Sequence, residues 1–376
     1  MTHTGLHMSK VNLKGLSLLE LEELVEGWGE PKFRAKQLMS WLYHQRETNF
    51  QIMTNLPKSF RRKLSDAACV SDIRVCARAE SDLDSAVKYL FELTDGSRIE
   101  SVLMPDRNRM TVCVSSQVGC AMACDFCATG KMGFFRNLSS AEIVDQVIAI
   151  QRELDGDKDV THVVFMGMGE PLANYDQTVN AVRLMTRVEG LGLPERRITV
   201  STVGLASRMR QFAREGLKCQ LALSLNATTD KVRTRLMPIN TRYPIADVLD
   251  AAREWTLASG NPVTLEYVLI RDVNDGVEDA HRICKLMSRL PCKLNIIPFN
   301  EIVDSEFRRP EPNRIEQFRR IVSKKCYVAP IRFSKGKDIT AACGQLRTVY
   351  GNQGITLRKA SQFVNTQTAT FNPAGV

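Results

Sequence analysis

An alternation of strand and helix patterns from residue 106 onward most constrains how this chain of 376 residues can fold. Short runs rich in β-branched and aromatic residues recur there, and segments with helical periodicity separate them. Such alternation is typical of parallel βαβ units, which form either a barrel or an open sheet. The predicted strands are residues 111–114, 162–166, 198–201, 220–225, 263–269, 293–297 and 331–333.

The part of the chain before this region predicts a small helical domain and a hairpin. The first helix pattern opens with a capping box, Ser17 and Glu20, and the third begins at Pro57, a residue suited to a first helical turn. Two β-prone runs then flank Asp95-Gly96, the strongest short hairpin signal. The expected units are an N-terminal helical domain at 1–70, a β-hairpin linker at 71–105, an α/β core at 106–350 and a loosely ordered tail at 351–376.

Composition agrees with an ordinary globular protein. The apolar share is 44% and the charged share is 25%. The sequence shows no secretory signal and no apolar run long enough to span a bilayer, so its eleven cysteines do not predict a disulfide scaffold. We therefore expect a cytoplasmic protein without membrane contact, and we also expect a monomer. The net charge of +9 slightly favours a polyanionic partner.

Three cysteines, Cys120, Cys124 and Cys127, follow the first predicted strand of the core. Four Cys ligands are usual for an iron–sulfur cluster, and four Cys or His ligands close a structural zinc site. Three thiols with an aromatic residue, Phe126, before the last one favour a four-iron cluster that leaves one iron open to a substrate. Taken alone, the spacing also fits zinc or chance.

Polar residues follow other predicted strands, where barrel folds place their chemistry at the C-terminal strand ends. Gly167-Met-Gly-Glu-Pro171 follows the second strand, Ser201 closes the third, and Ser224-Leu225-Asn226 closes the fourth. Asn300 comes shortly after the sixth strand, and Cys343 lies in the segment after the last. These groups are the candidates for a site.

The cysteine triplet, followed one strand later by Gly-Met-Gly-Glu-Pro, resembles the radical S-adenosylmethionine (SAM) superfamily. In that superfamily three thiolates bind a [4Fe-4S] cluster, and SAM chelates its fourth iron. The resemblance implies a partial (β/α)6 barrel with metal ligands Cys120, Cys124 and Cys127. Further motifs look like those of the RlmN adenine-C2 RNA methyltransferases, within the RlmN/Cfr family; they are Val114–Cys120, Gly167–Leu172, Met237–Asn240, Ile296–Asn300 and Asp338–Leu346.

The family resemblance implies a covalent reaction that uses two SAM molecules per turnover. The first methylates Cys343, and the second is cleaved at the cluster to give a radical that removes hydrogen from this methyl group. The resulting methylene radical adds to C2 of an adenosine in 23S ribosomal RNA or transfer RNA. Glu100 then accepts the C2 proton, and Cys113 attacks the Cys343 sulfur, which releases 2-methyladenosine and leaves a disulfide. The scheme needs an electron donor for the cluster and a reductant for the disulfide.

The resemblance also implies SAM contacts, and the chain departs from the family at two positions. Many relatives have His where this chain has Asn226, and the asparagine keeps a hydrogen-bonding side chain. Many also have Arg where this chain has Lys335, and the lysine offers phosphate a point charge in place of a bidentate contact. Glu100 lies in an apolar strand, where burial would raise its pKa and suit it to accept a proton. The implied SAM contacts are Gly169, Glu170, Ser201, Ser224, Leu225, Asn226 and Asn300.

Other interpretations compete with these assignments. Without the resemblance, Cys113 and Cys343 are interpreted as ordinary core thiols and Glu100 as a side chain that points to solvent. The basic residues of the N-terminal helices are then a solvated face. If the substrate is RNA, these helices are instead expected to bind it. A Cfr-type enzyme shares most motifs but methylates adenine C8, and Gly-Glu-Pro with Ile-Pro-Phe-Asn300 favours the C2 enzymes. A non-catalytic metal-containing RNA-binding protein would need neither Cys343 nor SAM cleavage.

Overall fold

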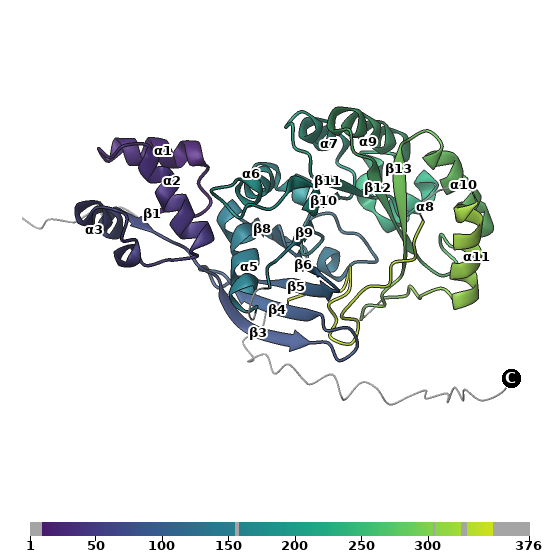
Figure 1. Cartoon of the computed structure of the whole chain (residues 1–376). Coiled ribbons are helices and arrows are strands. Elements are labelled where there is room, and N and C mark those ends of the chain that lie inside the picture. Colours follow the sequence, from purple (N-terminus) through teal and green to yellow (C-terminus); the bar gives the residue numbers. More distant parts are fainter. Residues whose placement is uncertain (1–9, 155–157, 304, 325–328, 349–376) are drawn as a thin grey trace, which may run out of the picture.

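A nine-stranded mixed sheet forms the centre of the computed structural model, which describes residues 10–154, 158–303, 305–324 and 329–348. Its strand order is β13-β12-β11-β10-β9-β6-β5-β4-β3 (Figure 1). Every neighbouring pair from β6 to β13 is parallel, which confirms the predicted α/β core. These strands are β6 (Arg109–Cys113), β9 (His162–Phe165), β10 (Ile198–Thr202), β11 (Gln220–Ser224), β12 (Val263–Leu269) and β13 (Cys292–Pro298).

Helices connect the parallel strands and lie around the outside of the curved sheet (Figure 1). The first of them begins at the capping box that Ser139 forms with Glu142, and its apolar residues are buried. No helix in the described parts of the chain is long and apolar enough to cross a bilayer. The covering helices are α5 (Ser140–Arg152), α6 (Tyr175–Thr186), α7 (Ala206–Ala213), α9 (Ile245–Ser259), α10 (Val277–Met287) and α11 (Pro312–Ser323).

The strand predicted at residues 331–333 is wrong, because the backbone makes only one bridge there. Ile331 pairs in parallel with Ile296, through bonds from the Ile296 amide to the Pro330 carbonyl and from the Arg332 amide to the Ile296 carbonyl. Proline has no amide hydrogen to extend the ladder backward. The tail predicted at 351–376 lies outside the described residues.

The hairpin predicted around Asp95-Gly96 is confirmed, and it continues the central sheet. Strands β3 (Arg74–Glu80), β4 (Val87–Glu92) and β5 (Arg98–Asp106) pair antiparallel in succession. The last of them pairs antiparallel with β6, where Val102 lies opposite Cys113. This register brings Glu100 close to the strand that carries Cys113.

The N-terminal residues form the predicted helices, α1 (Leu18–Gly27), α2 (Phe33–Met39) and α3 (Lys58–Ala67). The capping box of Ser17 and Glu20 is present, and Pro57 is the N-cap of α3. A π-helical turn (Ser40–His44) extends α2, and a short parallel pair of β1 (Val11–Asn12) with β2 (Ala68–Cys69) closes the unit.

A buried ion pair joins this helical unit to the core. The Lys14 ammonium lies 2.5 Å from a carboxylate oxygen of Asp145 on α5, and both side chains are almost fully buried. Next to it, the Gly15 carbonyl accepts hydrogen bonds from Ser140 Oγ and Asn180 Nδ2. Burial raises the pKa of Asp145 to about 6, and the charge of Lys14 acts against this rise. The ammonium therefore stabilises a carboxylate that the interior would otherwise disfavour.

We predict that Lys14→Met lowers the free energy of unfolding by about 3–5 kcal/mol, because it leaves the Asp145 carboxylate buried without a cation. Urea-induced unfolding measures this loss. Lys32→Met is the matched control, since Lys32 makes an exposed ion pair with Glu26 at 3.4 Å and such pairs contribute little. Equal losses in the two variants would contradict the prediction.

Candidate active site

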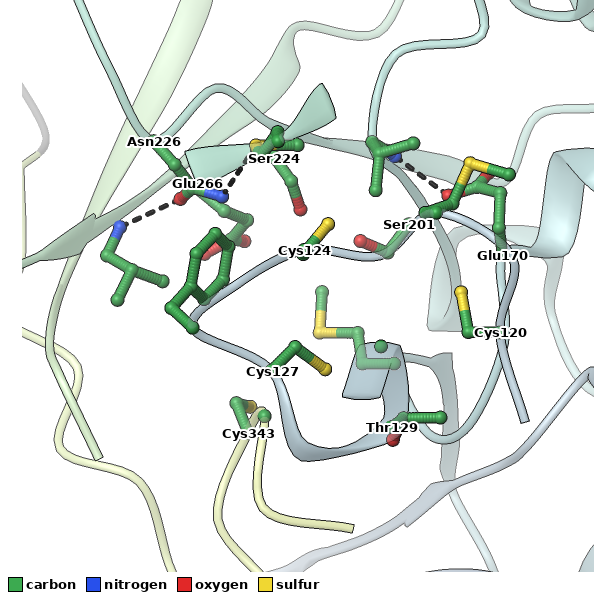
Figure 2. Close-up of a pocket in the computed structure, with 18 of the residues that line it drawn as sticks. Cys120, Cys124, Cys127, Thr129, Glu170, Ser201, Ser224, Asn226, Glu266 and Cys343 are labelled. Carbon is green, nitrogen blue, oxygen red and sulfur yellow. Dashed lines mark hydrogen bonds between the residues drawn. The ribbon is translucent and has the colours of Figure 1, made fainter. Parts of the chain in front are cut away.

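The three predicted metal-binding cysteines lie on one loop, between β7 (Gln117–Gly119) and the short helix α4 (Ala128–Lys131). Figure 2 shows Cys120, Cys124 and Cys127 around a common space. The loop is held at its base, where β7 pairs with β8 (Phe134–Asn137) and the Cys120 amide donates to the Gly133 carbonyl. A Cβ on Gly119 would lie only 2.0 Å from that carbonyl oxygen, so the turn requires glycine.

The electrostatics of these thiols fit a cationic iron–sulfur core. Burial raises the pKa of Cys120 to about 12 and that of Cys124 well above its usual range, and the neighbouring thiols raise both further. The Cys120 and Cys124 thiolates would therefore not persist side by side without a positive group. Among the described residues, no three Cys, His, Asp or Glu side chains converge as ligands of a single ion would. A four-iron cluster does not need such convergence, because each thiolate binds a different iron.

The glycine-rich loop after β9 forms a second wall of the pocket. Gly169 has φ +101°, and a Cβ on it would lie 2.6 Å from Gln117 Cβ. Glu170 is fully buried behind the loop, where its carboxylate accepts hydrogen bonds from the amides of Leu172 and Val203. Burial raises the pKa of Glu170 to about 7. The carboxylate thus joins the loop after β9 to the end of β10.

The strand ends from β10 to β13 supply the remaining wall, and the structure brings most of the predicted SAM contacts together there. Leu225 is an exception, because its side chain is buried in the core. Asn226 has φ +56°, and its Oδ1 accepts a hydrogen bond from the Val268 amide at 2.9 Å, so this part of the side chain already bonds to protein. The predicted SAM contacts that line the pocket are Gly169, Glu170, Ser201, Ser224, Asn226 and Asn300.

Cys343 lines the same pocket as the three cysteines (Figure 2). Two hydrogen bonds dock its segment onto α4: the Ala128 amide donates to the Gly344 carbonyl at 2.7 Å, and Thr129 Oγ1 donates to the Leu346 carbonyl at 2.6 Å. The thiol opens into the pocket, yet surrounding protein raises its pKa to about 11. A residue more than two hundred positions beyond the cysteine loop therefore lies beside it.

Cys113 and Glu100 lie outside the residues that line the pocket. Burial raises the pKa of Cys113, and the charge of Cys343 raises it further. Burial also raises the pKa of Glu100, which Lys88 opposes through an ion pair at 3.2 Å. The other Glu100 oxygen accepts a hydrogen bond from the amide of Arg347, on the segment that carries Cys343.

The structure adds one side chain to the predicted site and corrects the prediction for another. Glu266 on β12 lines the pocket and was missed; Asn295 Nδ2 donates to it at 2.8 Å, and burial raises its pKa to about 7. An isolated glutamate in an apolar strand was the available signal, a pattern that Glu100 shares but that by itself suggests a side chain in solvent. Lys335, predicted to offer a charge to phosphate, donates to the Pro105 carbonyl instead.

Two family models match the chain. The ribosomal RNA large subunit methyltransferase N-terminal domain matches residues 11–70, and the radical SAM superfamily matches residues 114–286. The dual-specificity RNA methyltransferase RlmN of Geobacter sulfurreducens is 48% identical over 90% of this chain and 92% of that protein. The protein of the same name from Geotalea uraniireducens is 46% identical, over 90% of this chain and 97% of its own length.

A solved structure is similar over the same extent. It is a radical SAM methyltransferase from Sphaerobacter thermophilus, with a TM-score of 0.85 and 42% sequence identity. The match covers 90% of this chain and 99% of that one. The similarity therefore includes the helical unit and the hairpin as well as the parallel strands.

We predict that Gly169→Ala weakens SAM binding about tenfold or more, because the added Cβ must displace the loop from Gln117. Calorimetric titration of SAM into the anaerobically reconstituted protein measures the change. Gly192→Ala is the control: Gly192 also has a positive φ, but no atom lies within 4 Å of its Cβ position. Wild-type affinity in the Gly169 variant, or equal weakening in both, would show that the close approach does not matter.

Proposed function

Because this chain belongs to the RlmN family of radical SAM RNA methyltransferases, we propose that it converts adenosine to 2-methyladenosine in 23S ribosomal RNA and in transfer RNA. It is a SAM-dependent RNA methyltransferase with the predicted radical SAM fold and an N-terminal domain. The radical SAM family implies one [4Fe-4S] cluster and SAM. The name "dual-specificity" in the relatives supports two classes of RNA substrate.

One observation carries the proposal: Cys343 opens into the pocket that the three clustered cysteines line. Cys120, Cys124 and Cys127 would hold the cluster, and the wall residues would hold SAM, with Leu225 contributing backbone only. When bound, these groups supply the radical chemistry that adenine C2 needs, because this ring carbon has no nucleophilic lone pair. The assigned SAM contacts remain Gly169, Glu170, Ser201, Ser224, Leu225, Asn226 and Asn300.

Two thiols and a carboxylate would complete the reaction. Cys343 receives a methyl group from the first of two SAM molecules and becomes the link to RNA. Glu100 accepts the C2 proton, and its raised pKa favours this step. Protonation makes the carboxyl group neutral and so breaks its ion pair with Lys88. Cys113 then attacks the Cys343 sulfur, which forms a disulfide and breaks the link to RNA, and the released methylene carbon takes up a proton. The one electron left over from the radical addition would return to the cluster. An external reductant must restore the two thiols, and an external donor must supply electrons to the cluster.

The domain assignments and the cellular setting are part of the same proposal. Residues 1–70 would bind RNA, 71–105 would carry Glu100, and 106–350 would hold SAM. The ion pair between Lys14 and Asp145 supports a fixed placement of the RNA-binding unit on the core. We also infer a cytoplasmic monomer.

Of the two alternative functions, one is set aside and one becomes an outcome of the test. A non-catalytic RNA-binding protein does not agree with relatives that are methyltransferases over nearly their whole length. Methylation at C8 by a Cfr-type enzyme would use the same cluster and thiols. Only the product distinguishes it.

We expect anaerobically reconstituted protein, given SAM, dithionite and RNA, to form deoxyadenosine and 2-methyladenosine. Separate reactions with a 23S ribosomal RNA fragment and with transfer RNA, followed by mass spectrometry of the digested nucleosides, identify the product and the RNA class. 8-methyladenosine as the sole product would refute the C2 assignment. A product in only one reaction would refute dual specificity alone.

We predict that Cys113→Ala accumulates a covalent protein–RNA adduct, because no thiol remains to release the methylated base. The adduct would appear as a shifted band in a denaturing gel. Cys219→Ala is the control, since Cys219 is also a buried thiol but has no proposed role. Free methylated RNA at wild-type yield from the Cys113 variant would contradict the resolving function.

A further inference from the structure

Arg233, on the short helix α8 (Asp230–Leu236), is buried completely. Every donor nitrogen of its guanidinium is hydrogen-bonded, which is uncommon for a side chain that normally keeps its charge in water. Nε donates to Leu225 O at 3.1 Å, Nη2 to Val203 O at 2.5 Å and Ser224 O at 3.3 Å, and Nη1 to Asn240 Oδ1 at 2.9 Å and Tyr243 O at 3.2 Å.

All of these acceptors are neutral. Within the described ranges no carboxylate lies within 4.0 Å of the Arg233 guanidinium, and Asp230 acts on it only from a longer distance. Burial lowers the pKa of Arg233 to about 10, so the side chain remains positive at neutral pH. A buried charge without a counter-charge is strongly unfavourable. Among the described residues, no carboxylate therefore pairs directly with this buried positive charge.

This charge lies directly behind the site. Val203 and Ser224, whose carbonyls it binds, line the pocket. The last residue of α8, Leu236, accepts a hydrogen bond from the Asp125 amide in the cysteine loop, and it packs with Cys124.

We propose that Arg233 is a positioning residue that braces the SAM-binding wall and supplies the buried counter-charge for a cluster held by Cys120, Cys124 and Cys127. A four-iron core with three thiolates carries a net negative charge, which grows when an electron is added. A fixed positive charge nearby therefore favours the reduced form, because net charge and surroundings set the potentials of such clusters. The inference depends on the cluster and on SAM binding, and it is independent of the RNA substrate.

Asn240 takes part in the same arrangement. It belongs to Met237-Pro-Ile-Asn240, a motif of the family resemblance that had no assigned role. Its Oδ1 accepts from Arg233, and its Nδ2 donates to Thr234 Oγ1 at 2.9 Å and to Asp230 Oδ1 at 3.1 Å. These contacts orient the amide so that its oxygen faces the guanidinium. The motif thus positions Arg233 through Asn240, and Arg233 in turn bonds to the carbonyls at the strand ends.

The test compares three variants of the reconstituted holoenzyme: Arg233→Gln, which removes the charge, Arg233→Lys, which keeps the charge but loses the planar fork, and Arg235→Gln as control. Arg235 lies on the same helix, is exposed, and pairs with Glu306 at 2.8 Å. Redox titration followed by electron paramagnetic resonance gives the equilibrium constant for one-electron reduction. Calorimetry gives the Kd for SAM, and iron content with thermal unfolding reports folding.

We expect Arg233→Gln to lower the reduction equilibrium constant about tenfold, equal to about 59 mV for one electron. Coulomb's law gives an effect of this order for a unit charge within roughly 10 Å at an effective dielectric constant of about 20. We expect Arg233→Lys to stay within about twofold of wild type in reduction but to bind SAM about tenfold more weakly, because a lysine cannot bond to all the wall carbonyls. Arg235→Gln should change neither quantity.

Three results would overturn the proposal. A folded, iron-loaded Arg233→Gln variant with the wild-type reduction equilibrium would exclude the counter-charge. An Arg233→Lys variant with wild-type SAM affinity would exclude the bracing function. If Arg233→Gln fails to fold, the Arg233→Lys variant tests the counter-charge instead. A tenfold shift of its reduction equilibrium, despite the retained charge, would also refute the proposal. Wild-type protein that takes up no iron would instead refute the cluster assignment.

Discussion

The parallel pairing of β6 with β9 and of β9 through β13 is the constraint on which the rest of the structure depends. Parallel strands end at the same edge of a sheet, so residues that follow them meet regardless of their separation in sequence. Here the cysteine loop, the Gly167–Pro171 loop, Ser201, Ser224 and Asn300 meet in this way. The antiparallel hairpin then adds Glu100 beside β6 without changing that edge.

A second long-range contact completes the pocket. The segment that carries Cys343 belongs to no regular strand in the described residues, and its position comes from hydrogen bonds to Ala128 and Thr129 at the start of α4. The same segment offers the Arg347 amide to Glu100. The cysteine loop, Cys343 and Glu100 are thus connected through one irregular stretch, so a local change there would affect all three.

The local signals in the sequence were sufficient for much of this fold. Capping at Ser17 and the turn at Asp95-Gly96 depend on neighbouring residues, and each was predicted with its element. The strand at 331–333 failed because β-prone composition does not reveal whether a partner is available. Glu266 and Arg233 were missed for a related reason: whether a charged side chain faces solvent or the pocket depends on the packing of distant elements, which no motif records.

The buried ionisable groups of the site explain why residues from distant parts of the chain must stabilise it. Glu170 and Glu266 are buried carboxyl groups with raised pKa values, and the thiols of the loop repel one another when ionised. Each is unfavourable alone, and hydrogen bonds from Val203 and Asn295 offset only part of the cost. A buried guanidinium behind the same wall opposes this excess of negative charge. The pocket is therefore arranged for charged occupants, and its stability without them should be lower than with them.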